Sequence, residues 1–226
     1  KLYSVLPADG VGDFTFSRNS AATRINKDGL IETVAVGKSR LNYPLIDGVV
    51  NGCPSHLLEP QRTNLITYSE DFSNAYWTKV NSAGSTLPNV TSNYGISPDG
   101  SLNADRIQVS RASGAADFSS VYKSISTSSV NRAYSIWLKS LSGTPTILIL
   151  NNDGIYVSQQ ITTEWVRYEL DLGVGTVTEI QLSVVGSNFV ANVSESADFL
   201  AYGAQLEVGS YPTSYIPTSG SAVTRV

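Results

Sequence analysis

The feature that most limits the fold of this chain is a period-two alternation of apolar and polar residues, with almost no helical spacing. The alternation is clearest in residues 133–140, 165–171 and 178–185. Because successive side chains of a strand point to opposite faces, each segment has one face suited to a core and one suited to water or a ligand. This pattern is typical of antiparallel sheets, so the sequence predicts an all-β fold.

Each of these three segments gathers its large apolar side chains on one face. The predicted core positions are Tyr134, Ile136, Leu138, Val166, Tyr168, Leu170, Ile180, Leu182 and Val184. The opposite faces carry Ser135, Trp137, Lys139, Trp165, Arg167, Glu169, Glu179, Gln181 and Ser183. Residues 146–150 are apolar on both faces and are predicted as a central strand, and residues 199–208 as a late strand.

Turn signals recur at short intervals along the chain. They are Asp28-Gly29, Asp47-Gly48, Asn51-Gly52, Asp99-Gly100 and Asn152-Asp153-Gly154. Such spacing indicates many short strands, hence a sandwich or a barrel. We expect a wrapping segment with short strands over residues 1–60, the main β domain over 61–210, and over 211–226 an extended, proline-containing tail that packs back on the domain. The polar stretch 78–103 is predicted as an extended loop over one edge, and the glycines at 173–175 as a turn.

Composition excludes several classes of protein. Hydrophobic residues make up 41% of the 226 and charged residues 15%, which favours a folded chain over a disordered one. The net charge of −4, without a basic stripe, argues against nucleic acid as a partner, and no apolar run is long enough for a membrane helix. Cys53 is the single cysteine, so no intrachain disulfide forms. The chain has no methionine and no signal peptide, which predicts a piece excised from a longer protein that continues beyond residue 226.

Three long motifs are distinctive: FSRNSAATRIN from residue 16, LLEPQRTNLITYSEDF from residue 57, and YGAQLEVGSYPTSYIPT from residue 202. Together they resemble a family of structural proteins of tailed bacteriophages, found among tail, fibre and head-decoration components. The resemblance covers nearly the whole chain. It implies a virion or extracellular location, other virion proteins as partners, and a homotrimer in the parent protein.

A second set of shorter elements lies between Asn64 and Gly209. These are Asn64-Leu65, Asp71-Phe72, Trp77, residues 134–139 and residues 165–168. They are similar to elements of the jelly-roll carbohydrate-binding modules attached to many glycanases. This resemblance implies an antiparallel two-sheet jelly-roll sandwich with one concave face, and glycan as a partner. Fold alone does not give function, so glycan binding has to be argued from a site.

The sequence offers no complete catalytic group. Jelly-roll glucanases carry a Glu-x-Asp-x-x-Glu strand, and here Glu169 and Asp171 begin such a motif, but Val174 stands where the second glutamate would be. Glycoside hydrolysis needs two carboxylates that flank the bond. His56 lies near Cys53 in sequence, whereas the members of a catalytic triad normally come from distant segments. We therefore predict that the chain is not an enzyme.

Glycan recognition typically needs an aromatic platform with polar groups beside it. An aromatic side chain on the polar face of a strand is a candidate platform, because covering it with a ligand is favourable. The candidate carbohydrate-binding residues are Trp137, Lys139, Trp165, Arg167, Tyr122 and Gln181, with Tyr156 as a further one. The alternative for each tryptophan is packing under a loop or at the edge of the sandwich.

No cofactor is predicted other than a structural calcium, which related jelly rolls often hold near the two ends of the domain. Calcium prefers several carboxylate and carbonyl oxygens. Glu70 and Asp71 are the candidate ligands, and the alternative is that they cap a turn. The matched modules usually carry an aspartate in the last strand, whereas residues 202–205 here contain no acid.

Two functions stay open at this point. The first is a non-catalytic virion module that binds host-surface or environmental glycan. The second is an architectural spacer or docking domain of a virion fibre or capsid decoration, with no small-molecule ligand. The exposure of Trp137, Trp165 and Tyr122 is the observation that best separates the two.

Overall fold

The computed structural model describes residues 16–46 and 48–226, and this part of the chain contains strands and turns but no helix. None of the described residues therefore forms a helix that could cross a bilayer. The strands are β1 (Ala22–Ile25), β2 (Ile31–Val34), β3 (Leu41–Asn42), β4 (Leu45–Ile46), β5 (Val49–Val50), β6 (Ser55–His56), β7 (Arg62–Asn64), β8 (Thr78–Asn81), β9 (Thr86–Ile96), β10 (Leu102–Ser110), β11 (Phe118–Ser140), β12 (Thr146–Asn152), β13 (Ile155–Gln160), β14 (Val166–Val185), β15 (Ser196–Val208) and β16 (Val223–Arg225). The all-β prediction is confirmed.

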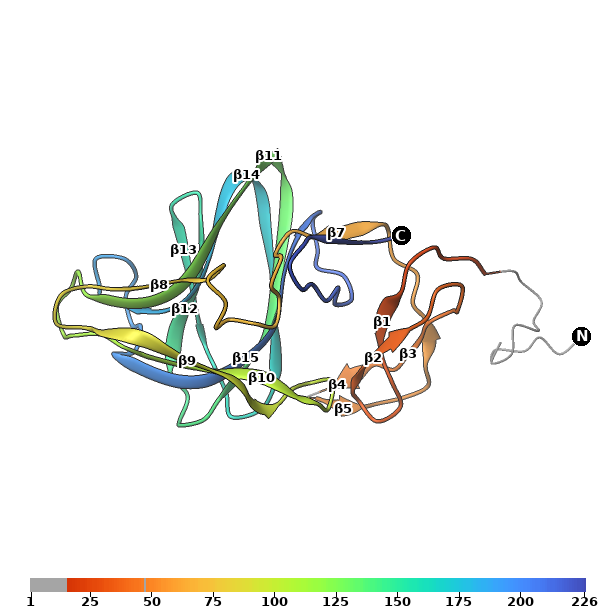
Figure 1. Ribbon diagram of the computed structural model, residues 1–226, viewed down its shortest axis with the longest axis horizontal. Coiled ribbons are helices and arrows are strands. Elements are labelled where there is room, and N and C mark those ends of the chain that lie inside the picture. The colour runs from red at the N-terminus through yellow and green to blue at the C-terminus, as the bar shows by residue number, and fades with distance from the viewer. Residues whose placement is uncertain (1–15, 47) are drawn as a thin grey trace, which may run out of the picture.

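Eight of these strands form one curled antiparallel sheet in the order β13-β12-β14-β11-β15-β10-β9, and β8 also pairs with β11. Two strands, β11 and β14, are long, curved and paired with each other along most of their length (Figure 1). The first part of β11 pairs with β8 and with the second part of β14; its second part pairs with β15 and with the first part of β14. This pairing divides the sheet into two halves. The β8 half contains β8, β12, β13, the first part of β11 and the second part of β14. The β15 half contains β9, β10, β15, the second part of β11 and the first part of β14.

Both halves contribute to one apolar core. Tyr134, Ile136 and Leu138 of the β15 half and Leu182 and Val184 of the β8 half are fully buried in the same cluster. Their neighbours in sequence point outward, as period-two alternation requires. Strand β12 is buried on both faces, although it lies next to the edge strand β13 rather than at the centre of the sheet. The core positions predicted in 133–140 and 178–185 are thus confirmed.

Two predictions about connections are wrong. The glycines at 173–175 do not end a strand, because β14 continues through them with a bulge at Leu172, where Gly173 takes a φ of 62°. Gly175 leaves room for the guanidinium of Arg132, which a Cβ atom would meet. The stretch 78–103 is not a loop but contains β8, β9 and the start of β10. Most side chains of β9 are exposed, so this strand lacks the apolar alternation that would reveal it.

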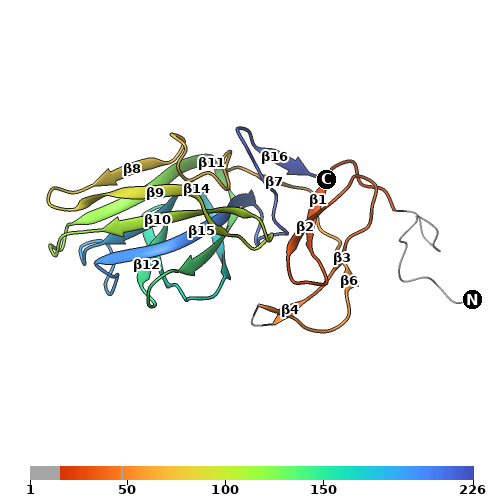
Figure 2. The same cartoon turned by 60° about the horizontal axis from the view of Figure 1, so that its bottom comes forward.

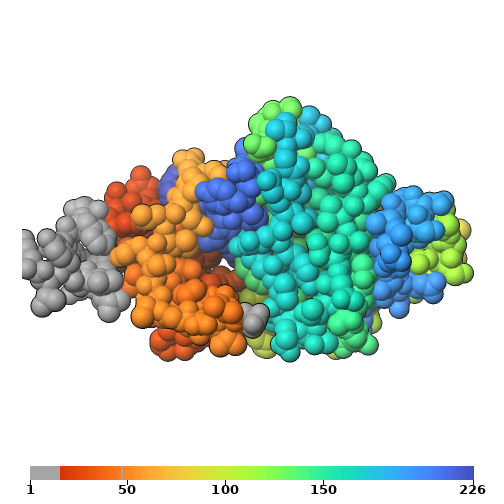
Figure 3. Space-filling model, turned by 180° about the vertical axis from the view of Figure 1, so that it is seen from behind, coloured from red at the N-terminus to blue at the C-terminus, as the bar shows by residue number. Residues whose placement is uncertain are grey.

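The N-terminal segment, residues 16–60, and the C-terminal tail, residues 211–226, cover the outer face of the β15 half. The segment forms small two-stranded ladders, and β16 of the tail pairs with β7 (Figure 2). Gln205 of β15 accepts a hydrogen bond from the backbone N–H of Ile216 at 2.6 Å. Thr23 of the segment donates to the backbone carbonyl of Tyr215 at 2.5 Å. The tail therefore lies between the segment and the sheet (Figure 3).

A buried ionic cluster joins the segment to the tail. The Oε2 atom of Glu59 lies 2.8 Å from Nη1 of Arg40 and 2.9 Å from Nη1 of Arg225, and it also accepts the Ser214 hydroxyl at 2.6 Å. Burial alone would raise the pKa of Glu59, but the hydrogen bonds from Ser214, the charge of Arg225 and the hydrogen bond from Arg40 outweigh it, so the pKa lies below its ordinary value. Because one carboxylate serves both arginines, its charge is essential to the cluster.

We predict that Glu59→Gln lowers the free energy of unfolding at pH 7 by about 3 kcal/mol, because two buried guanidinium groups lose their anion. A carboxyl whose folded pKa is lowered stabilises the fold above its unfolded pKa, and this contribution disappears as pH falls through the folded value. The difference between wild type and variant should therefore shrink below about pH 4. Urea unfolding of both proteins at several pH values measures this difference in unfolding free energy. Glu164→Gln, at an exposed glutamate, is the control, and an equal loss in both variants would contradict the prediction.

Candidate ligand-binding cleft

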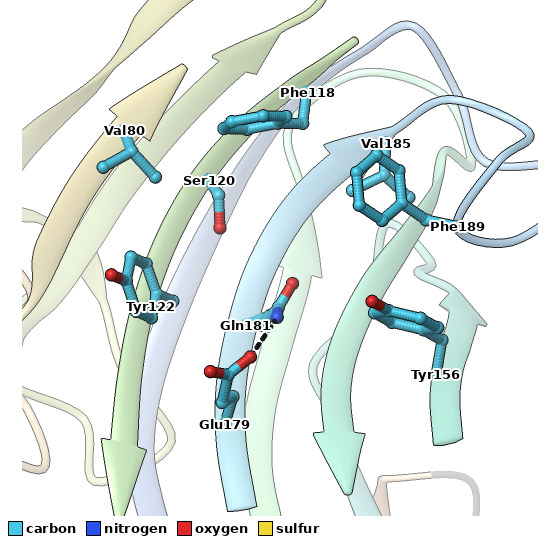
Figure 4. Close-up of a pocket in the computed structure, with 9 residues that line it drawn as sticks. All are labelled: Val80, Phe118, Ser120, Tyr122, Tyr156, Glu179, Gln181, Val185 and Phe189. Carbon is cyan, nitrogen blue, oxygen red and sulfur yellow. Dashed lines mark hydrogen bonds between the residues drawn. The ribbon is translucent and has the colours of Figure 1, made fainter. Parts of the chain in front are cut away.

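The outer face of the β8 half carries a cleft of about 270 Å³. Its walls and floor come from β8, β11, β13 and β14 and from the loop that follows β14 (Figure 4). The lining residues are Val80, Phe118, Ser120, Tyr122, Tyr156, Glu179, Gln181, Val185 and Phe189. Neither the N-terminal segment nor the tail contributes to this lining, so the cleft belongs to the sheet itself.

Strand alternation and register create the cleft. Phe118, Ser120 and Tyr122 are alternate residues of β11, and their neighbours Ser119 and Val121 are buried below them. In the pairing with β14, Tyr122 lies opposite Gln181, Ser120 opposite Ser183, and Phe118 opposite Val185. A change of register by one residue would exchange the cleft residues for core residues. The apolar core beneath therefore determines which side chains line the cleft.

The floor of the cleft is polar. Glu179 lies opposite Asn151 of β12, which in turn lies opposite Tyr156 of β13, so these residues form one row across three strands. Oε2 of Glu179 accepts hydrogen bonds from Nδ2 of Asn151 at 3.0 Å and from Nε2 of Gln181 at 3.1 Å. Oε1 of Glu179 and the hydroxyls of Tyr122 and Tyr156 make no hydrogen bond to any other described residue. These atoms can exchange water for the hydroxyl groups of a ligand.

Aromatic rings stand on both sides of this floor. Tyr122 lies on one side of Glu179 and Gln181, and Tyr156 lies on the other (Figure 4). Phe189 packs edge to face against both Tyr156, with ring centroids 5.9 Å apart, and Phe118, with centroids 6.1 Å apart. These T-shaped contacts hold the rings in place. The cleft therefore combines fixed apolar surfaces with free polar atoms.

The structure brings together two of the predicted carbohydrate-binding residues, Tyr122 and Gln181, and adds Tyr156, which sequence reasoning considered as a further candidate. It also adds Glu179, which the alternation in 178–185 had already placed on the same face as Gln181. Phe118 and Phe189 were missed. Phe118 begins a part of β11 whose polar residues give little strand signal, and Phe189 lies in a loop, so no spacing in the sequence points to it.

Trp137 and Arg167 lie away from the cleft, on the covered face of the β15 half. The ring of Trp137 packs against Tyr215, with centroids 5.5 Å apart, and against Tyr202 at 6.1 Å. The guanidinium carbon of Arg167 lies 4.5 Å from its ring centre. Gly203, with a φ of 65°, approaches the same ring so closely that a Cβ atom would lie 2.9 Å from it. Trp137 is therefore a packing residue between the sheet and the tail.

Arg167 and Trp137 border a smaller cavity of about 210 Å³ beneath the N-terminal segment. Trp165 is partly buried, packs in the same aromatic cluster and donates its indole N–H to the carbonyl of Ile96 at 3.1 Å. Lys139 is partly buried and lines neither cavity. The four candidates on this face are thus not arranged around one open binding surface.

Glu70 and Asp71, the predicted calcium ligands, line a cavity of about 300 Å³ together with Asp105. Burial raises the pKa of Glu70. Oε1 of Glu70 accepts the Tyr215 hydroxyl at 2.8 Å, and Oδ1 of Asp71 accepts the Ser73 hydroxyl at 2.6 Å. Among the described residues, no group of three or more acidic, histidine or cysteine side chains is placed to hold a metal ion. Calcium at this position stays a prediction.

Comparison with solved structures gives distant likenesses. No family model matches the chain, and no curated protein matches it. Among solved structures, the family 11 carbohydrate-binding module of the cellulase Lic26A-Cel5E of Clostridium thermocellum aligns over 65% of this chain and 94% of its own, with 13% identity and a TM-score of 0.42. A family 61 module in complex with β-1,4-galactotriose aligns over 65% and 99%, with 14% identity and a TM-score of 0.44.

A third likeness is to the enzymatically active domain of tailspike protein 4 of bacteriophage CBA120. It aligns over 65% of this chain but only 21% of that one, with 12% identity and a TM-score of 0.40. At this distance, the three likenesses assign neither a family nor a ligand to the chain.

We predict that Trp137→Ala lowers the free energy of unfolding by about 2–3 kcal/mol, because it leaves a cavity among Tyr202, Tyr215 and Arg167. Any glycan binding in the cleft should stay within twofold of wild type. Thermal unfolding and a binding titration on the same preparation measure both effects. Loss of binding at an unchanged melting temperature would contradict this assignment and restore Trp137 as a ligand platform.

Proposed function

We propose that this chain is a non-catalytic glycan-binding module and that the sugar binds in the cleft over β11 and β14. The observation that carries the proposal is the arrangement of Tyr122 and Tyr156 on either side of Glu179, whose Oε1 atom makes no hydrogen bond to a described residue. Sugars present apolar C–H faces, which pack on aromatic rings, and hydroxyl groups, which need hydrogen-bonding partners. The cleft supplies both kinds of contact.

The composition of the cleft supports binding rather than catalysis. Glu179 is the one carboxylate among its nine lining residues. Glycoside hydrolysis requires a pair of carboxylates on either side of the scissile bond. Glu169 is on the other half of the sheet, in an ion pair with Arg167 at 2.7 Å. The lining residues of the cleft can therefore hold a sugar but lack the second carboxylate that would cleave it.

We interpret the two halves of the curled sheet as the two sheets of a jelly-roll sandwich. The outer face of the β8 half, which carries the cleft, is its concave face. The parent protein in this proposal is a structural component of a phage virion, such as a tail fibre or a capsid decoration. The module would contact other virion proteins and be displayed outside the cell, in a homotrimer. The support for the virion role is the three long sequence motifs at residues 16, 57 and 202.

One observation favours the alternative of an architectural docking domain. The β4–β5 hairpin exposes Ile46 and Val49, at 56% and 68% of their surfaces, and Leu58 nearby in sequence is 76% exposed. Exposed apolar side chains that gather on one element can mark a contact with another protein. In this alternative the cleft would have no ligand, and the N-terminal segment would join the module to its neighbour.

We predict that Tyr122→Ala and Tyr156→Ala each weaken glycan binding at least tenfold, because each removes one aromatic wall. A glycan array identifies the ligand, and isothermal titration calorimetry measures its affinity. Tyr94→Ala is the matched control, since Tyr94 is 48% exposed but belongs to β9 at the other edge of the sheet. Absence of binding to every sugar at millimolar concentration would favour the architectural alternative.

The virion role has its own test. Antibodies raised against this chain should label purified phage particles at one defined structure in immunogold electron microscopy. Labelling of host cells without labelling of particles would contradict the virion role and leave the glycan proposal intact.

A further inference from the structure

The cleft has an uneven distribution of charge. Glu179 is its one charged residue, and it lies at one end of the cleft residues on β14, next to Gln181 and between the strands that carry Tyr122 and Tyr156 (Figure 4). No lysine or arginine is among the lining residues. Any group that approaches this end of the floor therefore meets a negative charge, and the lining residues offer no positive one.

The carboxylate is held in one orientation. The amide groups of Asn151 and Gln181 both donate to Oε2 of Glu179, at 3.0 and 3.1 Å. Oε1 makes no hydrogen bond to a described residue. The arrangement leaves one charged acceptor available to a ligand, and a charged acceptor makes stronger hydrogen bonds than a neutral one.

The two nearest lysines in sequence point to the other side of the sheet. Lys79 follows Thr78 and precedes Val80 in β8, and Lys123 follows Tyr122 in β11, so strand alternation turns both away from the cleft. Nζ of Lys79 donates to the carbonyl of Ser73 at 3.1 Å, and Nζ of Lys123 lies 4.3 Å from the ring centre of Tyr76. Neither ammonium group is available to neutralise an acidic ligand.

From this geometry we infer that the cleft selects uncharged glycans and that Glu179 is the residue that excludes acidic ones. The inference rests on the proposed function and specifies its substrate class. A neutral sugar can donate a hydroxyl hydrogen to Oε1 of Glu179. An ionised uronate or sulfate has no hydrogen to donate from its anionic group, and it is repelled by the carboxylate. Discrimination against one class of partner by like charge is a common source of specificity.

The test uses pairs of sugar chains that differ in charge and share their linkage and length. Cellohexaose, β-1,4-mannohexaose, β-1,4-galactohexaose and the best-binding hexose chain of the glycan array are each compared with their C6-oxidised forms, in which the 6-hydroxymethyl groups have become carboxylates. Isothermal titration calorimetry gives the ratio of the two dissociation constants for wild type, Glu179→Gln and Glu164→Gln. In Glu179→Gln the new side chain keeps the shape of the old one, and its carbonyl still accepts from Asn151 and Gln181. The fold should therefore be preserved, and thermal unfolding checks this.

Wild type should bind the neutral member of a pair at least tenfold more tightly than the oxidised member. Glu179→Gln should reduce this ratio at least fivefold, while Glu164→Gln, which removes the same charge at an exposed site, should leave it unchanged. In 1 M NaCl, where the screening length is about 3 Å, the wild-type ratio should fall toward that of Glu179→Gln.

Two results would overturn the inference while leaving the proposed function standing: equal affinity of wild type for both members of a pair, or a ratio that Glu179→Gln does not change. If wild type binds no sugar in the array or in the pairs, the proposed function fails and this inference fails with it.

Discussion

The pairing of β11 with β14 is the constraint on which the rest of the structure depends. Both strands run through both halves of the sheet, and their inward side chains, such as Tyr134 of β11 and Leu182 of β14, pack in one core that the other strands complete. Because side chains alternate, burying Val121 and Leu182 obliges Tyr122 and Gln181 to point outward and opposite one another. The same hydrophobic burial that stabilises the sheet thus assembles the floor of the cleft, so a slip in this register would destroy core and cleft together.

The outer faces of the two halves differ in whether other parts of the chain cover them. On the β15 half, the N-terminal segment and the tail cover the surface and are joined by the buried cluster of Glu59, Arg40 and Arg225. Trp137 becomes part of a packed aromatic group there, with Tyr215 supplied from the tail. On the β8 half, neither element contributes to the lining, and the aromatic side chains keep open space between them. An aromatic side chain that lies under the N-terminal segment or the tail is therefore a packing residue, whereas one on the uncovered face is a candidate ligand contact.

Local patterning in the sequence predicted the fold class and the buried faces of 133–140 and 178–185, because both depend on alternation within a single strand. Patterning could not predict that β14 continues past Gly173, since that depends on a bulge and on space for Arg132. It also placed both Trp137 and Gln181 on outward faces, but it could not show that one of these faces is covered and the other open. The difference comes from residues 211–226, distant in sequence, which cover one face and leave the other open.

In the proposed function, a glycan occupies the cleft over β11 and β14. The most direct test of this binding is an NMR titration of the isotopically labelled chain with the best-binding neutral glycan. Chemical-shift changes are expected at residues 118–124 and 177–185 and at Tyr156, with little change near Trp137. Changes centred on Trp137 and Trp165 instead, at saturating ligand, would contradict it.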